Sequence, residues 1–105
     1  MIKHKKDEGI KVNTTKVRGK DSKHKVLVYA LSTCAWCKKV KSFLKDHEIE
    51  YEYVDVDLCS EKEKEEIRRD ILNRGGELAY PIIIIDDEIL IHGFRGDEIK
   101  EALGI

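Results

Sequence analysis

Two cysteines separated by two residues, Cys34-Ala35-Trp36-Cys37, carry the clearest chemistry in this sequence. A thiolate attacks a disulfide, and a second thiol nearby can then attack the resulting mixed disulfide and release the substrate as a dithiol. Two intervening residues in a helical turn would place the second thiol within reach of the first. The spacing therefore predicts dithiol–disulfide exchange, with Cys34 as the nucleophile and Cys37 as the resolving cysteine.

The residues around this pair predict a strand before it and a helix after it. Residues 26–31 form a short apolar run of strand-forming types, the pattern of a strand buried on both faces. Ser32 and Thr33 are good helix N-caps. Apolar residues then follow at helical spacing, at Val40, Phe43 and Leu44. Because a helix N-terminus favours the thiolate form of a cysteine, we expect Cys34 to be the accessible sulfur and Cys37 the shielded one.

The remaining segments complete an α/β domain over residues 25–105. They predict a strand, a helix, a hairpin and a short final helix: residues 51–54, 61–74, 82–92 and 99–103. The second helix begins at a capping box made by Ser60 and Glu63. A crossover helix makes the first two strands parallel, and the hairpin adds antiparallel strands. The expected fold is a four-stranded mixed sheet flanked by three helices.

Residues 1–24 are interpreted as an N-terminal extension of this domain. They are basic and turn-prone, and they contain few apolar side chains. Ile10, Val12 and Val17 flank a pair of threonines, so an additional short strand over about residues 10–17 is one interpretation. A disordered arm is equally compatible with this composition.

Composition and charge argue against several classes of partner. Lysine and arginine number 20, aspartate and glutamate 21, and the net charge is -1, which favours neither nucleic acid nor an anionic membrane. No stretch reaches the roughly 18 apolar residues that span a bilayer, and the first residues lack the apolar centre of a secretory signal. Three cysteines cannot form a closed disulfide framework. We therefore expect a cytoplasmic monomer that binds neither membranes nor nucleic acid.

The cysteine pair also has a metal-binding interpretation, because Cys-x-x-Cys is half of a zinc site. The third cysteine, Cys59, precedes the second helix, and a fourth ligand would have to be a distant histidine such as His47 or His92. An iron–sulfur cluster bridged between two chains is a separate alternative. Cys59 is interpreted as a small buried hydrophobe. No separable cofactor is expected beyond a redox-active disulfide between Cys34 and Cys37.

Together with the single proline, the Cys-Ala-Trp-Cys segment resembles the glutaredoxin family of the thioredoxin superfamily. The segment follows a strand, and Tyr80-Pro81 leads into a later one, so the likeness covers residues 25–105. It implies a thioredoxin-like, glutaredoxin-type fold and a cis peptide bond before Pro81, facing the redox pair. A cis peptide occurs almost only before proline, and here it would leave backbone groups free to pair with an extended substrate. A strand-initiating proline is the alternative.

Three departures from typical glutaredoxins concern glutathione. Typical members have proline and tyrosine between the cysteines, a lysine three residues before the first cysteine, and a glycine pair that helps hold the glutathione carboxylate. The residues at these places are Ala35 and Trp36, Leu31, and Gly93-Phe94. Losing the lysine and one glycine removes a charge partner and backbone access. Glutathione is therefore not the electron donor that we expect. A glutathione-dependent glutaredoxin remains the alternative.

Residues 92–97, His-Gly-Phe-Arg-Gly-Asp, are similar to a segment of the glutaredoxin-like redoxins that donate electrons to ribonucleotide reductase. Leu31 departs from that group as well. The resemblance implies two partners, a disulfide-containing protein such as ribonucleotide reductase and a dedicated electron-donating reductase. The substrate groove is expected to involve Trp36, Tyr80, Pro81, Gly93 and Phe94. The predicted function is a thiol–disulfide oxidoreductase that reduces protein disulfides. We expect reduction rather than oxidation because the cytoplasm is a reducing compartment.

Overall fold

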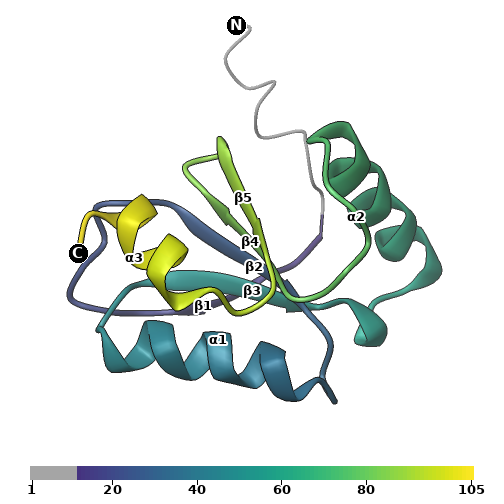
Figure 1. The fold of residues 1–105 in the computed structure, drawn as a ribbon. Coiled ribbons are helices and arrows are strands. Elements are labelled where there is room, and N and C mark those ends of the chain that lie inside the picture. Colours follow the sequence, from purple (N-terminus) through teal and green to yellow (C-terminus); the bar gives the residue numbers. More distant parts are fainter. Residues whose placement is uncertain (1–11) are drawn as a thin grey trace, which may run out of the picture.

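A five-stranded mixed sheet in the order β1-β3-β2-β4-β5 forms the centre of the molecule (Figure 1). The computed structural model describes residues 12–105. Its elements are β1 (Thr15–Val17), β2 (Val26–Ala30), α1 (Ala35–Asp46), β3 (Tyr51–Asp55), the 3-10 helix η2 (Val56–Leu58), α2 (Glu61–Asn73), β4 (Ile82–Ile85), β5 (Ile89–His92) and α3 (Gly96–Leu103). Strand β2 pairs parallel with β3 and antiparallel with β4, and β5 pairs antiparallel with β4. The predicted mixed sheet and its crossover are confirmed.

The N-terminal extension contributes the fifth strand. Strand β1 pairs antiparallel with β3, with Thr15 opposite Tyr53 and Val17 opposite Tyr51. The described part of the extension therefore follows the strand interpretation, over a shorter range than residues 10–17. Ile10 lies outside the described residues, and the boundary between residues 24 and 25 stays a prediction.

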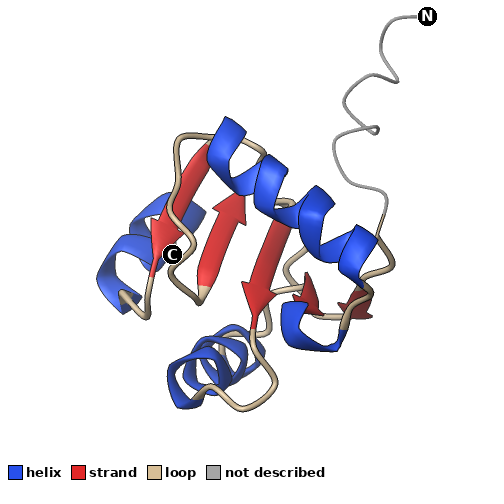
Figure 2. Cartoon of the chain, turned by 90° about the vertical axis from the view of Figure 1, so that its right-hand side faces the viewer, coloured by secondary structure: helices blue, strands red, loops and turns tan. Residues whose placement is uncertain are grey.

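The helices lie on both faces of the sheet, which explains the unbroken apolar run of β2. Val26, Val28 and Ala30 pack in the cluster under α1 and α3, whereas Leu27 and Tyr29 pack in the cluster under α2. All five residues are buried, as expected for a strand covered on both faces. Figure 2 shows the strands lying between helices on opposite sides of the sheet.

Helix α2 begins at the predicted capping box and ends where glycine was expected to stop it. The Ser60 hydroxyl accepts the Glu63 N–H at 3.2 Å, and a Glu63 carboxylate oxygen accepts the Ser60 N–H at 2.9 Å. Arg74 is the C-cap, and Gly75 follows with φ of +84°, a left-handed conformation that favours glycine. No helix in residues 12–105 is long and apolar enough to cross a membrane.

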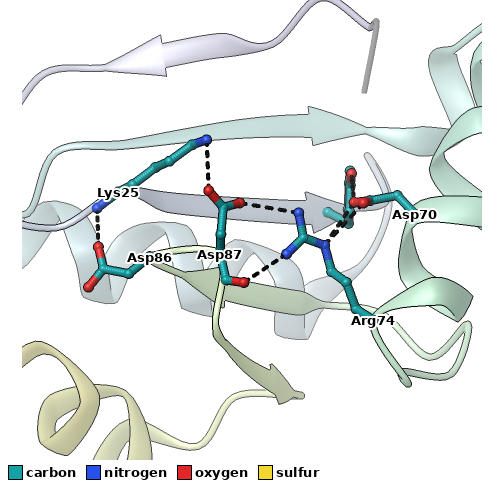
Figure 3. Close-up of polar contacts among 6 residues, drawn as sticks. Lys25, Asp70, Arg74, Asp86 and Asp87 are labelled. Carbon is teal, nitrogen blue, oxygen red and sulfur yellow. Dashed lines mark hydrogen bonds and ion pairs between the residues drawn. The ribbon is translucent and has the colours of Figure 1, made fainter. Parts of the chain in front are cut away.

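A polar network joins α2 to the sheet on the side away from α1 (Figure 3). Asp70 is buried, and one of its carboxylate oxygens accepts the Tyr29 hydroxyl proton at 2.6 Å. Arg74 Nε donates to both Asp70 oxygens at 3.1 Å, and Arg74 Nη2 donates to Asp87 Oδ1 at 3.2 Å. Burial and the Asp70 carboxylate raise the pKa of Tyr29, so this hydroxyl stays a donor. The network connects β2, α2 and the β4–β5 turn.

Candidate active site

The cysteine pair lies at the junction of β2 and α1, and Cys34 itself is the helix N-cap. Its backbone is extended, with φ of -90° and ψ of 121°, and its Sγ accepts the Cys37 N–H at 3.2 Å. The expectation that Ser32 or Thr33 would cap the helix is therefore wrong. The sulfur therefore occupies the capping position and accepts one of the first N–H groups of α1.

Ser32 lies two residues before the cap, and Asp57 binds it. Asp57 lies in η2, just after β3, and its two carboxylate oxygens accept the Ser32 N–H at 2.8 Å and the Ser32 hydroxyl at 2.5 Å. These hydrogen bonds hold the pKa of Asp57 below its usual range. Asp57 was missed from the sequence, although parallel strands end at the same edge of a sheet. An acidic residue just after β3 could thus have been placed beside the loop that follows β2.

The two cysteines differ in exposure in the direction that was predicted. Cys34 is half-buried, Cys37 is fully buried, and both are free thiols. Burial and the hydrogen bond with Cys34 raise the pKa of Cys37 to about 12. At neutral pH Cys37 therefore stays a protonated thiol. This arrangement suits a resolving cysteine that acts only after the more accessible Cys34 sulfur has formed a mixed disulfide.

The segment before β4 and the segment after β5 are joined beside the core that holds the cysteines. The peptide bond between Tyr80 and Pro81 is cis, as the family resemblance implied. The Pro81 carbonyl accepts the Gly93 N–H at 2.8 Å, and Gly93 has φ of +82°. Tyr80 is half-buried and, like Cys34, packs against the cluster under α1 and α3. The predicted groove residues Tyr80, Pro81 and Gly93 thus form one connected unit.

Trp36 and Phe94 form an aromatic surface along α1. The Trp36 side chain is 57% exposed, and its ring stacks against Phe94 with centroids 6.4 Å apart. Phe94 in turn meets Phe43 edge-on at 5.5 Å. A shallow surface pocket of about 320 Å³ adjoins these rings and is lined by Lys38, Lys39, Ser42, Phe43, Asp46 and Phe94. The structure therefore brings Trp36 and Phe94 together, as expected for two residues of one contact surface.

The described residues contain no group of side chains that would support the metal-binding interpretation. No three His, Cys, Asp or Glu side chains group there in a way that could hold a metal ion. His47 Nδ1 is hydrogen-bonded to the Phe43 carbonyl at 2.9 Å, and both ring nitrogens of His92 have backbone partners. Cys59 is half-buried, with its thiol donating to the Asp55 carbonyl at 3.6 Å. Cys59 is therefore less buried than its interpretation as a core residue required.

A mixed sheet, a Cys-x-x-Cys pair at the start of α1 and a cis-proline before β4 define a thioredoxin-like redox protein. A family model described as Glutaredoxin matches residues 26–90. The chain therefore belongs to the glutaredoxin family, and its general activity is thiol–disulfide oxidoreduction.

Individual relatives agree with this assignment. A glutaredoxin-like 8.6 kDa protein in the rubredoxin operon of Clostridium pasteurianum is 33% identical over 74% of this chain and 96% of its own length. The glutaredoxin-like protein NrdH of Lactococcus lactis subsp. lactis is 34% identical over 72% of this chain and 96% of its own length. The crystal structure of the glutaredoxin from Methanosarcina mazei Go1 has a TM-score of 0.80 and 40% identity. It covers 93% of this chain and 94% of its own. The similarity to this structure therefore extends beyond the residues that the family model matches.

Proposed function

We propose that this protein reduces protein disulfides in the cytoplasm through Cys34 and Cys37, without a separable cofactor, and that a dedicated reductase rather than glutathione restores it. The observation that carries the proposal is the placement of Cys34 Sγ as the cap of α1, above a buried Cys37 that stays protonated. Leu31 and Phe94 support the choice of donor, because neither supplies the charge or the backbone access that glutathione would use.

The exchange proceeds in two displacements. The Cys34 thiolate attacks one sulfur of the substrate disulfide, which breaks the S–S bond, forms a mixed disulfide and releases one substrate thiolate. That thiolate takes up a proton while Cys37 loses one. The Cys37 sulfur then attacks the Cys34 sulfur, which forms the Cys34–Cys37 disulfide and releases the second substrate sulfur as a thiolate that takes up a proton from water. Two electrons pass to the substrate, and the reductase returns two electrons to the cysteine pair.

Ribonucleotide reductase is the proposed protein substrate. Two observations support this partner: the resemblance of residues 92–97 to redoxins that serve this enzyme, and the similarity to the glutaredoxin-like protein NrdH. The exposed Trp36 is two residues after Cys34 in the chain and stacks with Phe94, so their aromatic surface is where we expect such a partner to contact the protein.

The donor can be tested by supplying the oxidised protein with either glutathione and its reductase or a thioredoxin-reductase-type flavoprotein, and following NADPH consumption. We expect the flavoprotein to be at least about tenfold faster, since one missing charge-assisted hydrogen bond costs about 1.5–3 kcal/mol. The Leu31→Lys and Phe94→Gly double variant restores the typical family pattern and should gain most of that factor with glutathione. Equal rates in the wild type would contradict the donor proposal. A coloured protein, or one that holds zinc stoichiometrically, would favour the metal carrier instead.

Two lysines beside the aromatic surface predict a preference for acidic substrates. Lys39 Nζ lies 5.5 Å from the Trp36 ring centroid, and Lys38 lines the same pocket as Lys39. Within residues 12–105 neither lysine forms an ion pair, whereas Lys41 is paired with Asp55 at 3.1 Å. The Lys38→Glu and Lys39→Glu double variant should lower kcat/KM for an acidic peptide disulfide about five- to tenfold at low ionic strength, and less at high salt.

A control for this charge reversal is Lys62→Glu, which changes the net charge by half as much at an exposed position on α2, on the other side of the sheet. It should leave the acidic substrate unaffected. Reduction of the uncharged 2-hydroxyethyl disulfide should stay unchanged in all variants, because the small substrate needs no charge partner. If Lys62→Glu had the same effect as the double variant, net charge rather than this surface would be responsible.

A further inference from the structure

His92, the last residue of β5, ties the segment before the cis-proline to the sheet. Its Nε2 lies 3.2 Å from the Glu77 N–H, which donates to it, and its Nδ1 lies 3.1 Å from the Ala79 carbonyl. The segment between α2 and β4 has no regular secondary structure, so few backbone bonds of its own hold it in place. His92 therefore supplies two of the contacts that fix this segment.

The chemistry of the two partners specifies one protonation state of the imidazole. A backbone N–H can only donate, so Nε2 must be an unprotonated acceptor. A backbone carbonyl can only accept, so Nδ1 must carry the proton. The bridge therefore requires the neutral Nδ1–H tautomer. Protonation of Nε2 would place two donors against each other at Glu77 and break that contact.

The position of this bridge connects it to the proposed substrate groove. The segment it holds leads directly into Tyr80 and Pro81, while the residue after His92 is Gly93, whose N–H is bound by the Pro81 carbonyl. The His92 carbonyl accepts Arg95 Nε at 2.9 Å, which holds the chain on the Phe94 side. One residue thus links the two segments that form the groove.

We propose that His92 is a positioning residue that holds residues 77–80 in the conformation that receives an extended disulfide substrate, and that its protonation loosens this hold. The inference rests on the proposed function, because it concerns the groove of that reaction. The titratable and charged groups of the adjoining segments are Glu77 and Tyr80 in the held segment and Arg95 on the other side. The partner of His92 across β4 is the uncharged Ile82.

Kinetics with two substrates separate the groove from the thiol chemistry. For each substrate, kcat/KM is measured between pH 5.5 and 8, and the value for an extended peptide disulfide is divided by the value for 2-hydroxyethyl disulfide. Ionisation of the attacking sulfur affects both values equally, so it cancels in this ratio. The ratio should fall about three- to tenfold on acidification, the effect of losing one hydrogen bond. His92→Phe should show the low ratio at every pH. His92→Gln offers an amide oxygen to Glu77 at every pH, so its ratio should stay high and flat.

The control is His24→Gln, which changes a histidine at Asp86, at the opposite end of β4, and should retain the wild-type profile. A wild-type ratio that does not change with pH, or an unchanged ratio in His92→Phe, would overturn the inference while the small-substrate activity still supports the proposed function.

If neither substrate is reduced, the proposed function fails. In that case the bridge is still tested by ¹⁵N spectra of the His92 ring and by hydrogen exchange of the Glu77 amide. The inference would be overturned if the His92 ring were the Nε2–H tautomer at neutral pH. It would also be overturned if the protection of the Glu77 amide against hydrogen exchange did not decrease on acidification.

Discussion

Cys34→Ser should abolish the reduction of a peptide disulfide, lowering turnover by about a thousandfold or more, as removal of an attacking nucleophile does in other enzymes. Cys37→Ser should behave differently. Its Cys34 can still attack, but no neighbouring thiol displaces the captured substrate. This variant should therefore accumulate one equivalent of mixed disulfide, detectable by intact-protein mass spectrometry, and then stop. Turnover of the wild type and of Cys34→Ser is measured with a chemical reductant in excess and corrected for the rate without protein. The Cys37→Ser mixed disulfide is instead trapped by mixing the reduced variant with the peptide disulfide after the reductant has been removed.

Cys59→Ser is the matched control, since it removes a half-buried thiol outside the pair and should retain full turnover. Alkylation of the reduced wild type with iodoacetamide adds a pH test. Because the pKa of Cys37 is raised to about 12, its thiolate fraction is very small at neutral pH and grows only in strongly alkaline solution. Cys34 should be labelled first at neutral pH. Faster labelling of Cys37, or turnover in Cys34→Ser, would contradict the assigned roles.

Asp70→Ala should lower the free energy of unfolding by about 3 kcal/mol, because it removes the acceptor of a buried hydroxyl and the partner of a largely buried guanidinium. Tyr29 would keep a fully buried O–H without this acceptor, and Arg74 would retain only its contacts with Asp87 (Figure 3). The measurement is urea denaturation followed by circular dichroism. Activity per folded molecule should not change, since the network lies under α2 rather than at the cysteines.

Two further variants show whether the network, rather than α2 in general, carries this stability. Tyr29→Phe should cost about 1 kcal/mol, the net value of one hydrogen bond. Arg68→Ala, which removes an exposed ion pair with Glu65 on the same helix, should stay within about 0.5 kcal/mol of the wild type. If Asp70→Ala destabilised the protein no more than Arg68→Ala does, the buried network would contribute little to stability.

Elements whose signals are local were predictable from the sequence. Such signals depend only on residues a few positions apart. Examples are the apolar run of residues 26–31, the capping box of Ser60 and Glu63, and the isoleucine strand followed by Asp86-Asp87. The same holds for the redox chemistry, because Cys34 and Cys37 lie within one turn of the chain. The cis bond before Pro81 was implied by family resemblance, and its place in the chain could be read from the only proline.

Contacts between distant segments were decided only by the tertiary structure. Asp57 is 25 residues from Ser32, and it binds the residue that lies two positions before the Cys34 cap of α1. Asp70 is 41 residues from Tyr29, and in the sequence it looks like one more charge on a solvated helix. Neither hydrophobic periodicity nor a capping rule predicts such pairs, because they depend on how the helices pack against the sheet. The sequence by itself predicted which sulfurs would react, and the packing of β2, η2 and α1 determines how the Cys34 sulfur is held.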